Sequence, residues 1–271
     1  MSLLKNTIPI YLLLYFNCLK AQQPNLFLPI GHTGAVNTVN FSPDGKKIVT
    51  ASDDNSAKIW DAQSGLLLLD LKGHTSKILS AFFSTDNNKI VTASSDHTAK
   101  IWDAQNGALL AILEGHTGIV FCASFSSDGK KIVTAGDQMA KIWDAQSGKL
   151  IADLKGHTWG FYNASFSSDG TRVLTAGDEA ARIWDAQTGT LMLTIKEHTD
   201  YFGSNCFSPD GTKIMTTSQH STIKIWDAQN GTLLTEFKGT EWITKASFSP
   251  DNKMVVTFGG SMAKIWNVET G

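Results

Sequence analysis

Short apolar runs, separated by turn-forming residues, recur along this chain at a nearly constant interval. The clearest marker is a tryptophan that closes one run in each copy, followed by Asp or, in the last copy, Asn. Successive copies are 42, 41, 41, 42 and 40 residues apart, at Trp60, Trp102, Trp143, Trp184, Trp226 and Trp266. Such a period is the signature of a repeat architecture, in which each unit buries its apolar face by packing on its neighbours. The chain is therefore predicted to be one module used six times.

Each copy contains four apolar segments of strand length, named a to d here. In the first copy we predict strand a at 36–41, strand b at 47–52 and strand c at 57–61. Turns such as Ser-Pro-Asp-Gly at 42–45 separate a from b, with Pro and Gly where a tight turn favours them. Strand d precedes the start of each copy, and its six versions are 25–30, 66–71, 109–113, 150–154, 191–195 and 233–237.

Six strands of each type make 24, enough for a ring of six four-stranded sheets. The ring closes if 25–30 pairs with strand c of the last copy, 263–267. Closure removes open sheet edges, which would otherwise invite aggregation. The alternative is that this chain is part of a ring with seven or more sheets.

The first 21 residues do not belong to the repeat. Lys5 precedes a short apolar run at 8–16, and Leu-Lys-Ala at 19–21 is a candidate cleavage site. Because the run is too short to span a bilayer comfortably, we predict a removable signal peptide over 1–21 and a repeat domain over 22–271. Only Cys122 and Cys206 then remain, and they are not expected to meet. A disulfide-free exported protein favours a bacterial route, secreted or periplasmic, with a membrane tether through an uncleaved segment as the alternative.

A Gly-His opening, a Ser-x-Asp-Gly turn and an Ile-Trp-Asp close, as in residues 31–61, resemble the WD-repeat β-propeller family over residues 25–271. The resemblance implies an all-β propeller of antiparallel four-stranded blades, with repeats at 31–61, 73–103, 115–144, 156–185, 197–227 and 239–267. It also implies that a His, a strand b Thr, an Asp of the b–c turn and the Trp form one hydrogen-bonded set per repeat. Those sets are His32, Thr50, Asp54, Trp60; His74, Thr92, Asp96, Trp102; His116, Thr134, Asp137, Trp143; and His157, Thr175, Asp178, Trp184.

These residue types are chemically suited to such a set. A buried indole N–H needs an acceptor, and a hydroxyl can accept it and donate onward to an imidazole. Hydroxyl, imidazole and carboxylate also describe a hydrolase triad, but four copies in one ring favour a structural clamp. The sequence has no nucleophile elbow, no zinc-spaced cluster and no phosphate-binding glycine loop. We therefore predict no catalytic residues, no cofactor and no metal.

Repeats five and six depart from this pattern. Glu197-His198 replaces Gly-His and His220 takes the Asp position in the fifth, while the sixth lacks the His and has Gly260 at the Asp position. We expect these two blades to be less tightly held. Drift explains the departures most simply, with a functional switch at His198 and His220 as the alternative.

A cation stands two residues before every closing tryptophan. Strand alternation puts each cation on the same face as its Trp. We expect solvated tips whose aliphatic stems cover the blade. The six are Lys58, Lys100, Lys141, Arg182, Lys224 and Lys264.

The copies differ most in the residues just after the Gly-His position. In the family, this segment lines the top face, around the central channel, where partners dock. Large side chains cluster there in repeats three to six, and clustered exposed aromatics are typical of binding hot spots. The candidate partner-binding residues are Ile119, Phe121, Trp159, Tyr162, Tyr201 and Trp242. The alternative is that some of them fold down into the channel.

These observations favour a non-catalytic, monomeric scaffold that binds a protein or peptide through its top face. With 23 Lys+Arg against 25 Asp+Glu and no basic block, nucleic acid is not an expected partner. An extracytoplasmic propeller that binds a glycan or small ligand is the alternative. A propeller enzyme is disfavoured, because Asp53 and Asp200 are the only acids expected near that face and they lie in separate blades.

Overall fold

The computed structural model describes residues 31–271 except 137–138, 158–162, 178–179, 197–201, 219–220, 240–242, 244 and 260, and only the backbone of 202–204. The expected signal peptide at 1–21 and the expected strand at 25–30 therefore lie outside the described residues. No helix long and apolar enough to cross a membrane occurs in the part that is described.

The described chain is all-β, with 23 strands in six antiparallel sheets. Strands a are β1 (Val36–Phe41), β5 (Ile78–Phe83), β9 (Val120–Phe125), β13 (Asn163–Phe166), β17 (Phe202–Phe207) and β21 (Lys245–Phe248). Strands b are β2 (Lys47–Ser52), β6 (Lys89–Ser94), β10 (Lys131–Gly136), β14 (Arg172–Gly177), β18 (Lys213–Ser218) and β22 (Met254–Gly259). Strands c are β3 (Ser56–Asp61), β7 (Ala99–Asp103), β11 (Met139–Asp144), β15 (Ala180–Asp185), β19 (Thr222–Asp227) and β23 (Met262–Asn267). Strands d are β4 (Leu67–Lys72), β8 (Leu109–Leu113), β12 (Leu150–Lys155), β16 (Leu191–Lys196) and β20 (Leu233–Lys238).

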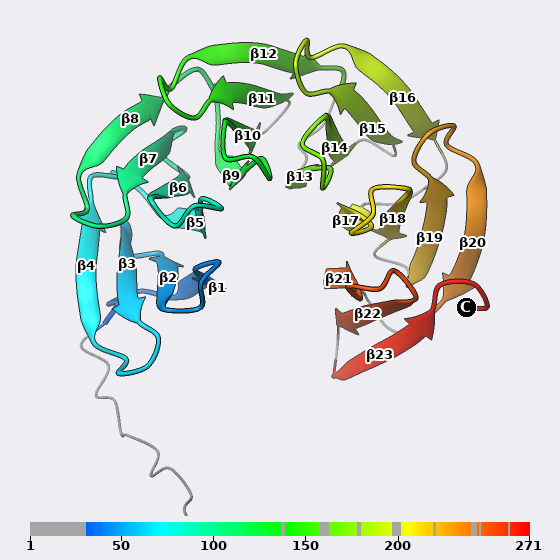
Figure 1. Cartoon of the computed structure of the whole chain (residues 1–271), viewed down its shortest axis with the longest axis horizontal. Coiled ribbons are helices and arrows are strands. Elements are labelled where there is room, and N and C mark those ends of the chain that lie inside the picture. The colour runs from blue at the N-terminus through cyan, green and yellow to red at the C-terminus, as the bar shows by residue number, and fades with distance from the viewer. Residues whose placement is uncertain are drawn as a thin grey trace, which may run out of the picture. The chain divides into compact units, whose positions relative to one another are not determined.

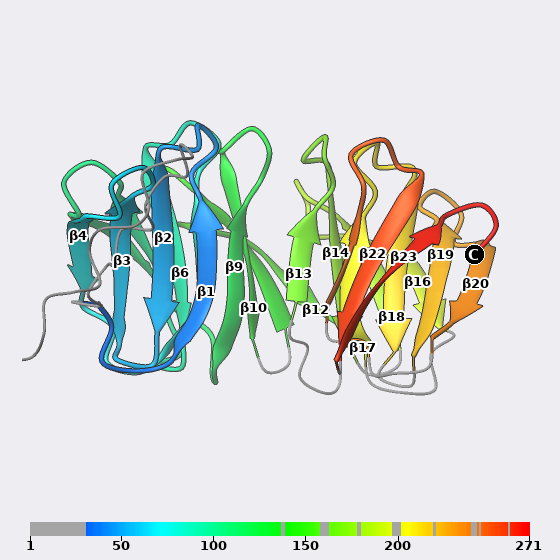
Figure 2. The same cartoon turned by 90° about the horizontal axis from the view of Figure 1, so that it is seen from below.

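Within each sheet the strands pair in the order a, b, c, d, so chain neighbours are sheet neighbours. The first five sheets have four strands and the sixth has three, β21–β22–β23, among the described residues. Figure 1 shows the sheets in chain order, each with strand a innermost; strand d is outermost in the first five and β23 in the sixth. In the side view of Figure 2, the strands run between the upper and the lower side of the unit formed by residues 31–271. The all-β class and six sheets agree with the sequence prediction; the predicted ring closure is not seen.

The hydrophobic core lies between consecutive sheets. In the second to fifth sheets, strand a contacts strand b of the sheet before it, as β5 contacts β2 and β9 contacts β6. One cluster joins Val91 and Ile101 of the second sheet to Val120, Ile132 and Trp143 of the third. Since each internal sheet contributes both its faces to such clusters and each terminal sheet contributes one, no sheet has a core of its own.

The two terminal sheets each leave one apolar face uncovered by the described residues. On β1, Val39 and Phe41 are exposed, whereas the residues at these positions in β5, Ala81 and Phe83, are buried. On β23, Ile265 is 70% exposed, while its counterparts in the other five sheets are buried. The uncovered face of β1 and the uncovered face of β23 are therefore equivalent to the two faces that pack against each other between neighbouring sheets.

The Asp that follows the tryptophan caps the turn from strand c to strand d. Asp61 Oδ1 accepts hydrogen bonds from the Ser64 amide (2.7 Å) and the Ser64 hydroxyl (2.6 Å). Gly65 completes this turn with a φ of +69° and donates its amide to the Asp61 carbonyl. Because only glycine adopts this backbone conformation at no cost, the Trp-Asp and Gly positions recur together.

Candidate functional site

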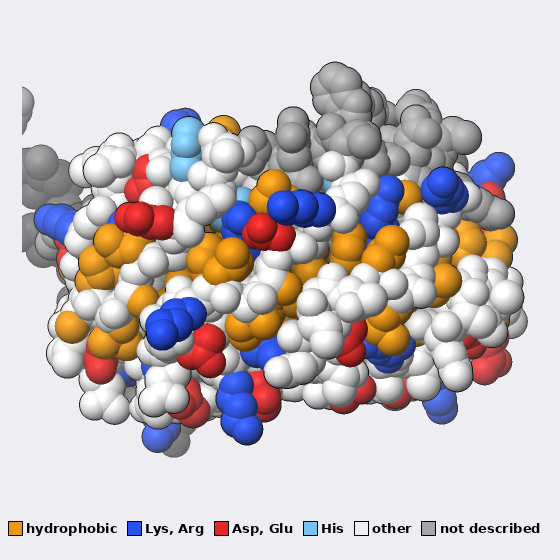
Figure 3. Space-filling model, turned by 90° about the horizontal axis from the view of Figure 1, so that it is seen from above, with side chains coloured by type: hydrophobic (Ala, Val, Ile, Leu, Met, Phe, Trp, Pro, Cys, Tyr) orange, Lys and Arg blue, Asp and Glu red, His pale blue; other side chains and the backbone are white. Residues whose placement is uncertain are grey.

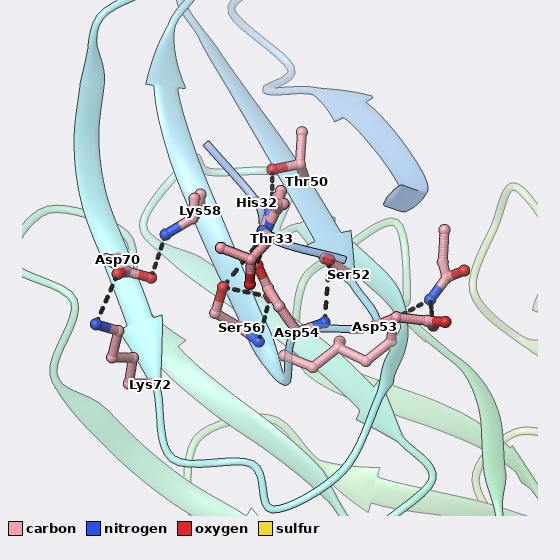
Figure 4. A network of polar contacts seen from close by, with 12 residues as sticks. His32, Thr33, Thr50, Ser52, Asp53, Asp54, Ser56, Lys58, Asp70 and Lys72 are labelled. Carbon is pink, nitrogen blue, oxygen red and sulfur yellow. Dashed lines mark hydrogen bonds and ion pairs between the residues drawn. The ribbon is translucent and has the colours of Figure 1, made fainter. Parts of the chain in front are cut away.

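In the first repeat the four residues His32, Thr50, Asp54 and Trp60 form one chain of hydrogen bonds. His32 Nε2 lies 2.7 Å from Thr50 Oγ1, and Trp60 Nε1 donates to the same oxygen over 2.9 Å. His32 Nδ1 lies 2.9 Å from Asp54 Oδ2 (Figure 4). An indole only donates, so the hydroxyl accepts from Trp60 and donates to Nε2, which leaves the proton of His32 on Nδ1 for Asp54.

The second repeat has the same geometry in a more buried setting. His74 Nε2 lies 2.7 Å from Thr92 Oγ1 and Nδ1 lies 2.7 Å from Asp96 Oδ2. Trp102 Nε1 donates to Thr92 Oγ1 over 2.9 Å, and the Thr92 side chain is completely buried. A hydroxyl that is buried and already accepts an indole N–H cannot attack a substrate. The arrangement ties the loop before strand a to strands b and c.

Each carboxylate has a further partner that the sequence reasoning missed. Ser56 donates its hydroxyl to Asp54 Oδ1 over 2.7 Å, and Thr98 does the same for Asp96. The Thr33 amide donates to the other oxygen of Asp54 (2.9 Å). The sequence contains a signal for this contact. In both repeats a hydroxyl residue stands two positions after the Asp, and short polar side chains in turns often form such local hydrogen bonds.

These bonds control the protonation of the buried groups. Burial acts to raise the pKa of Asp96, but hydrogen bonds from Thr98, His74 and the Thr75 amide together lower that pKa to about 2. The pKa of Asp54 is likewise held well below its usual range, against the effect of burial, by Ser56, the Thr33 amide and His32. Burial lowers the pKa of His74, and its bond to Asp96 only partly opposes this. The second set therefore favours a neutral imidazole and an ionised carboxylate.

In repeats three and four, Asp137 and Asp178 lie outside the described residues, and the remaining three residues are in contact. His116 and His157 lie 2.7 and 2.8 Å from the hydroxyls of Thr134 and Thr175. Trp143 and Trp184 each donate to the same hydroxyl over 2.8 Å. In the fourth repeat, Arg182 Nη1 also approaches His157 Nδ1 at 2.5 Å.

Repeats five and six retain the Trp-to-Thr bond. Trp226 donates to Thr216 over 2.8 Å and Trp266 donates to Thr257 over 2.9 Å. The substituted positions, His198, His220 and Gly260, lie outside the described residues, so the expected looseness of these blades stays a prediction. The indole–hydroxyl bond is thus present in all six repeats.

The expectation of solvated strand c cations is wrong for three of the six. Lys58, Lys100 and Lys141 are buried, with exposed fractions of 6, 6 and 4%. Lys58 Nζ lies 2.9 Å from Asp70 and Lys141 Nζ lies 2.5 Å from Asp153, both on the neighbouring strand d. For Lys58 and Lys141 the physical reason is the cross-strand carboxylate, which compensates burial of the lysine. The Asp-x-Lys pattern that ends β4 and β12 was its unused signal, and β8 carries no such pattern.

The structure places only two of the candidate partner-binding residues. Ile119 is 37% exposed in the loop before β9, and Phe121 is half-buried on β9. Trp159, Tyr162, Tyr201 and Trp242 lie outside the described residues, so the proposed aromatic cluster is not seen assembled.

The corresponding end of the first two sheets carries a polar cluster instead. Lys77 Nζ lies 2.6 Å from Asp53 Oδ2, and Asn37 donates to Asp53 Oδ1 over 2.9 Å. Asp53 is on the b–c turn of the first sheet, whereas Lys77 is in the loop before β5, so the cluster joins two sheets. The bonds from Lys77 and Asn37 lower the pKa of Asp53.

Neither cysteine is poised for chemistry. Burial raises the pKa of Cys122 to about 11 and that of Cys206 to about 12, so both stay protonated thiols at neutral pH. Both are free rather than disulfide-bonded. Over the described ranges, no three His, Cys, Asp or Glu side chains are grouped so that they could hold a metal ion.

Comparison with known proteins bears directly on the repeat. The model of the family described as "WD domain, G-beta repeat" matches residues 23–61, 65–103, 107–144, 148–185, 189–227 and 231–267. Ribosome assembly protein 4 of Saccharomyces cerevisiae is 47% identical over 55 residues, which are 20% of this chain and 10% of that protein. Eukaryotic translation initiation factor 3 subunit I of Drosophila melanogaster is 31% identical over 67 residues, 21% of each chain. WD repeat-containing protein 38 of Mus musculus is 51% identical over 37 residues, 14% of this chain and 12% of that protein. The chain thus matches only a small part of each relative.

These relatives correct the expected localisation. They come from eukaryotes, and two are named for ribosome assembly and translation initiation, which contradicts a secreted or periplasmic protein of bacterial export. The expectation depended on one lysine and an apolar run at 8–16, and so short a run is not specific for export. The membrane-tethered alternative depended on the same segment and is dropped with it, whereas binding of a glycan or small ligand stays an untested alternative.

Replacing Thr92 by alanine should destabilise the protein by about 2–4 kcal/mol. The change leaves Trp102 Nε1 and His74 Nε2 buried without their shared partner, and each such group costs about 1–3 kcal/mol. Thr92→Ser keeps the hydroxyl and should cost under about 1 kcal/mol. Urea denaturation followed by far-UV circular dichroism measures both variants, and equal losses would show that the hydroxyl is not what holds this set.

The same set should make stability depend on pH. Because the pKa of His74 is lower in the folded state, unfolded chains bind its proton more readily, so stability is lost as pH falls below about 6.5. Because the pKa of Asp96 is about 2 when folded, its contribution is lost as pH falls from about 4 toward 2. We expect the free energy of unfolding of Asp96→Asn to fall by about 1–2 kcal/mol less than that of the wild-type chain between pH 5 and 2.5, as measured from urea midpoints. An unchanged slope in that variant would argue against the assignment.

Proposed function

The chain belongs to the WD-repeat family, and on that premise we propose that it is a non-catalytic scaffold that binds a protein or peptide partner through its top face. The top face is the end formed by the loops before strands a and by the b–c turns. We further propose that the chain acts as a monomer, without cofactor or metal and without nucleic acid as a ligand.

The observation that carries this proposal is Ile119, a large apolar side chain left exposed on that face. It stands in a loop that begins at His116, whose Nε2 is held by the buried Thr134 hydroxyl. Loops held in place by a rigid scaffold are where binding residues concentrate. On the same face, the cluster of Asn37, Asp53 and Lys77 in the first two sheets offers polar contacts, so the face combines apolar and charged groups as interfaces do.

The relatives support the same class of function. One is named as a subunit of a translation initiation factor and another for ribosome assembly, and a subunit acts by contact with other proteins. On this chain, the hydroxyl that a hydrolase would use as nucleophile is buried and accepts an indole hydrogen bond in each repeat, which supports a structural role for the set.

We also propose that 25–30 closes a ring of six blades as the fourth strand of the last sheet. Three findings support this closure. The sixth sheet has three described strands, and the apolar faces of β1 and β23 are uncovered. The first family match begins at residue 23, as far ahead of β1 as the second, third and fifth matches begin ahead of β5, β9 and β17. A ring of seven or more blades would place further chain between these two faces.

Replacing Ile119 by glutamate should weaken partner binding by about tenfold or more, since truncated hot spots cost about 2 kcal/mol or more. Ile151→Glu is the matched control, because Ile151 is equally exposed (37%) but lies on the outer strand β12. Both variants should keep the wild-type urea midpoint. Quantitative affinity capture from cells that express each variant measures the effect, with Tyr162→Ala and Tyr201→Ala expected to behave like Ile119→Glu. Equal capture by all variants would exclude the top face.

Replacing 25–30 with an equal length of Gly and Ser should lower the urea midpoint and expose the amides of β23 to hydrogen exchange, because the replacement has no apolar face to pair there. The same replacement over 22–24, just outside the proposed strand, is the control. If amides 263–267 exchange rapidly in the wild-type chain, the six-bladed closure fails.

A further inference from the structure

The contact between the fourth and fifth sheets contains an amide side chain where the other contacts between neighbouring sheets contain an alanine. Asn205 of β17 is only 3% exposed. At its position, strands β5, β9, β13 and β21 all carry alanine. In the first three contacts this alanine (Ala81, Ala123 or Ala164) belongs to the hydrophobic cluster, whereas the described part of β17 adds only Phe207 to the fourth cluster.

Asn205 lies beside two polar side chains of β13. Asn163 Nδ2 donates to the Asn205 carbonyl over 3.1 Å and to its side-chain oxygen Oδ1 over 2.9 Å. Ser165 stands two residues after Asn163, so it faces the same side of β13. In the first sheet the residue at the position of Ser165 is Asn40, which donates to the carbonyl of Ala81, the residue at the position of Asn205. Ser165 therefore faces Asn205 as well.

Two polar groups of this cluster are buried and, among the described residues, have no hydrogen-bond partner. They are the side-chain nitrogen Nδ2 of Asn205 and the hydroxyl oxygen of Ser165. A buried polar group without a partner has lost its bonds to water and gained nothing in exchange. When water reaches these two groups, the lost bonds are restored. This part of the contact therefore gains on opening, whereas an apolar contact only loses.

Arg172 holds the same two sheets together at the end opposite the top face. It is the first residue of β14, and its guanidinium donates to two carbonyls of the fifth sheet, Gly211 over 2.7 Å and Ala228 over 3.0 Å. The guanidinium carbon also lies 5.1 Å from the centre of the Phe207 ring. In the first sheet the residue at this position, Lys47, makes a single bond of this kind. The lower end of the contact between the fourth and fifth sheets is thus firmly held.

The outer part of this contact is apolar. Ile183 and Ile195 of the fourth sheet and Ile214 and Trp226 of the fifth are buried in one cluster. Hydrophobic side chains also form a band across the outer side of the sheets (Figure 3). Separation of the outer strands would expose this apolar surface to water, which is unfavourable. Opening is therefore confined to the inner strands β13 and β17.

We propose that the contact between β13 and β17 is a hinge, at which these strands separate above Arg172 and admit water to Asn205 and Ser165. Every sheet stays paired within itself, so the movement differs from the release of a whole sheet. Tyr162 and Tyr201, two of the proposed partner-binding residues, directly precede β13 and β17 in the chain. The hinge thereby changes the spacing between two parts of the partner-binding face, a role that rests on the proposed function.

The test measures how fast iodoacetamide alkylates a thiol at this contact in the full chain, without a partner. The variant is Ser165→Cys, and its internal control is Cys206, which holds the position of Ser165 on β17 and packs toward the sixth sheet. Mass spectrometry of the digested protein should show the introduced thiol alkylated at least about tenfold faster than Cys206. Adding Asn205→Ala should slow the introduced thiol by about tenfold without lowering the urea midpoint, because opening then hydrates no buried amide.

Thr38→Val is the matched control, since Thr38 Oγ1 is also buried without a partner in the described chain but lies on β1. It should leave alkylation of the introduced thiol unchanged. Equal rates for that thiol and Cys206, or a rate that Asn205→Ala does not slow, overturns the proposal. So does equal slowing by Thr38→Val and Asn205→Ala, because the thiol is then reached by unfolding of the whole chain. Since no partner is present, the hinge can fail this test while the proposed function stands.

Discussion

The bond from each closing tryptophan to a strand b threonine is the interaction on which the rest of this structure depends. It is present in all six repeats, at 2.8–2.9 Å. A tryptophan is the largest side chain that each repeat packs against its neighbours, but when it is buried its N–H must find an acceptor. The threonine hydroxyl satisfies that need and still has a proton to give. That spare proton is what allows the histidine, and through it the aspartate, to be fixed in turn.

The same hydrogen-bonded set explains why the repeats can differ in their surface residues. Where histidine and aspartate are both in place, as in the second repeat, the loop before strand a is tied to its own sheet by three successive contacts. The loop ends that this fixes are also where the copies differ in sequence. A constant hydrogen-bonded interior thus supports a variable surface, and function can change there without disturbing the packing between sheets.

Most of the fold follows from the sequence because the repeat presents the same pattern six times. Strands β1 and β2 have the predicted bounds, while β4 begins and ends one residue later than expected. A register shift between Ile59 and Trp60 lies at this strand pair, and hydrophobic pattern alone cannot locate such an irregularity. The Lys58–Asp70 pair was missed for a related reason, since pairing partners are known only once the register is. The localisation predicted from the apolar run at 8–16 was wrong because short hydrophobic runs occur in many kinds of protein.

The sharing of hydrophobic clusters between neighbouring sheets has a consequence for how the molecule comes apart. An internal sheet such as the third is covered on both faces by apolar side chains of its neighbours, so it cannot open without exposing parts of two clusters. The first and last sheets lose only one such contact, and their outer faces are already uncovered by the described chain. Local opening is therefore cheapest at the two ends and becomes costlier toward the middle. Any contact that covers the outer faces of the first and last sheets would therefore slow the opening of the whole molecule.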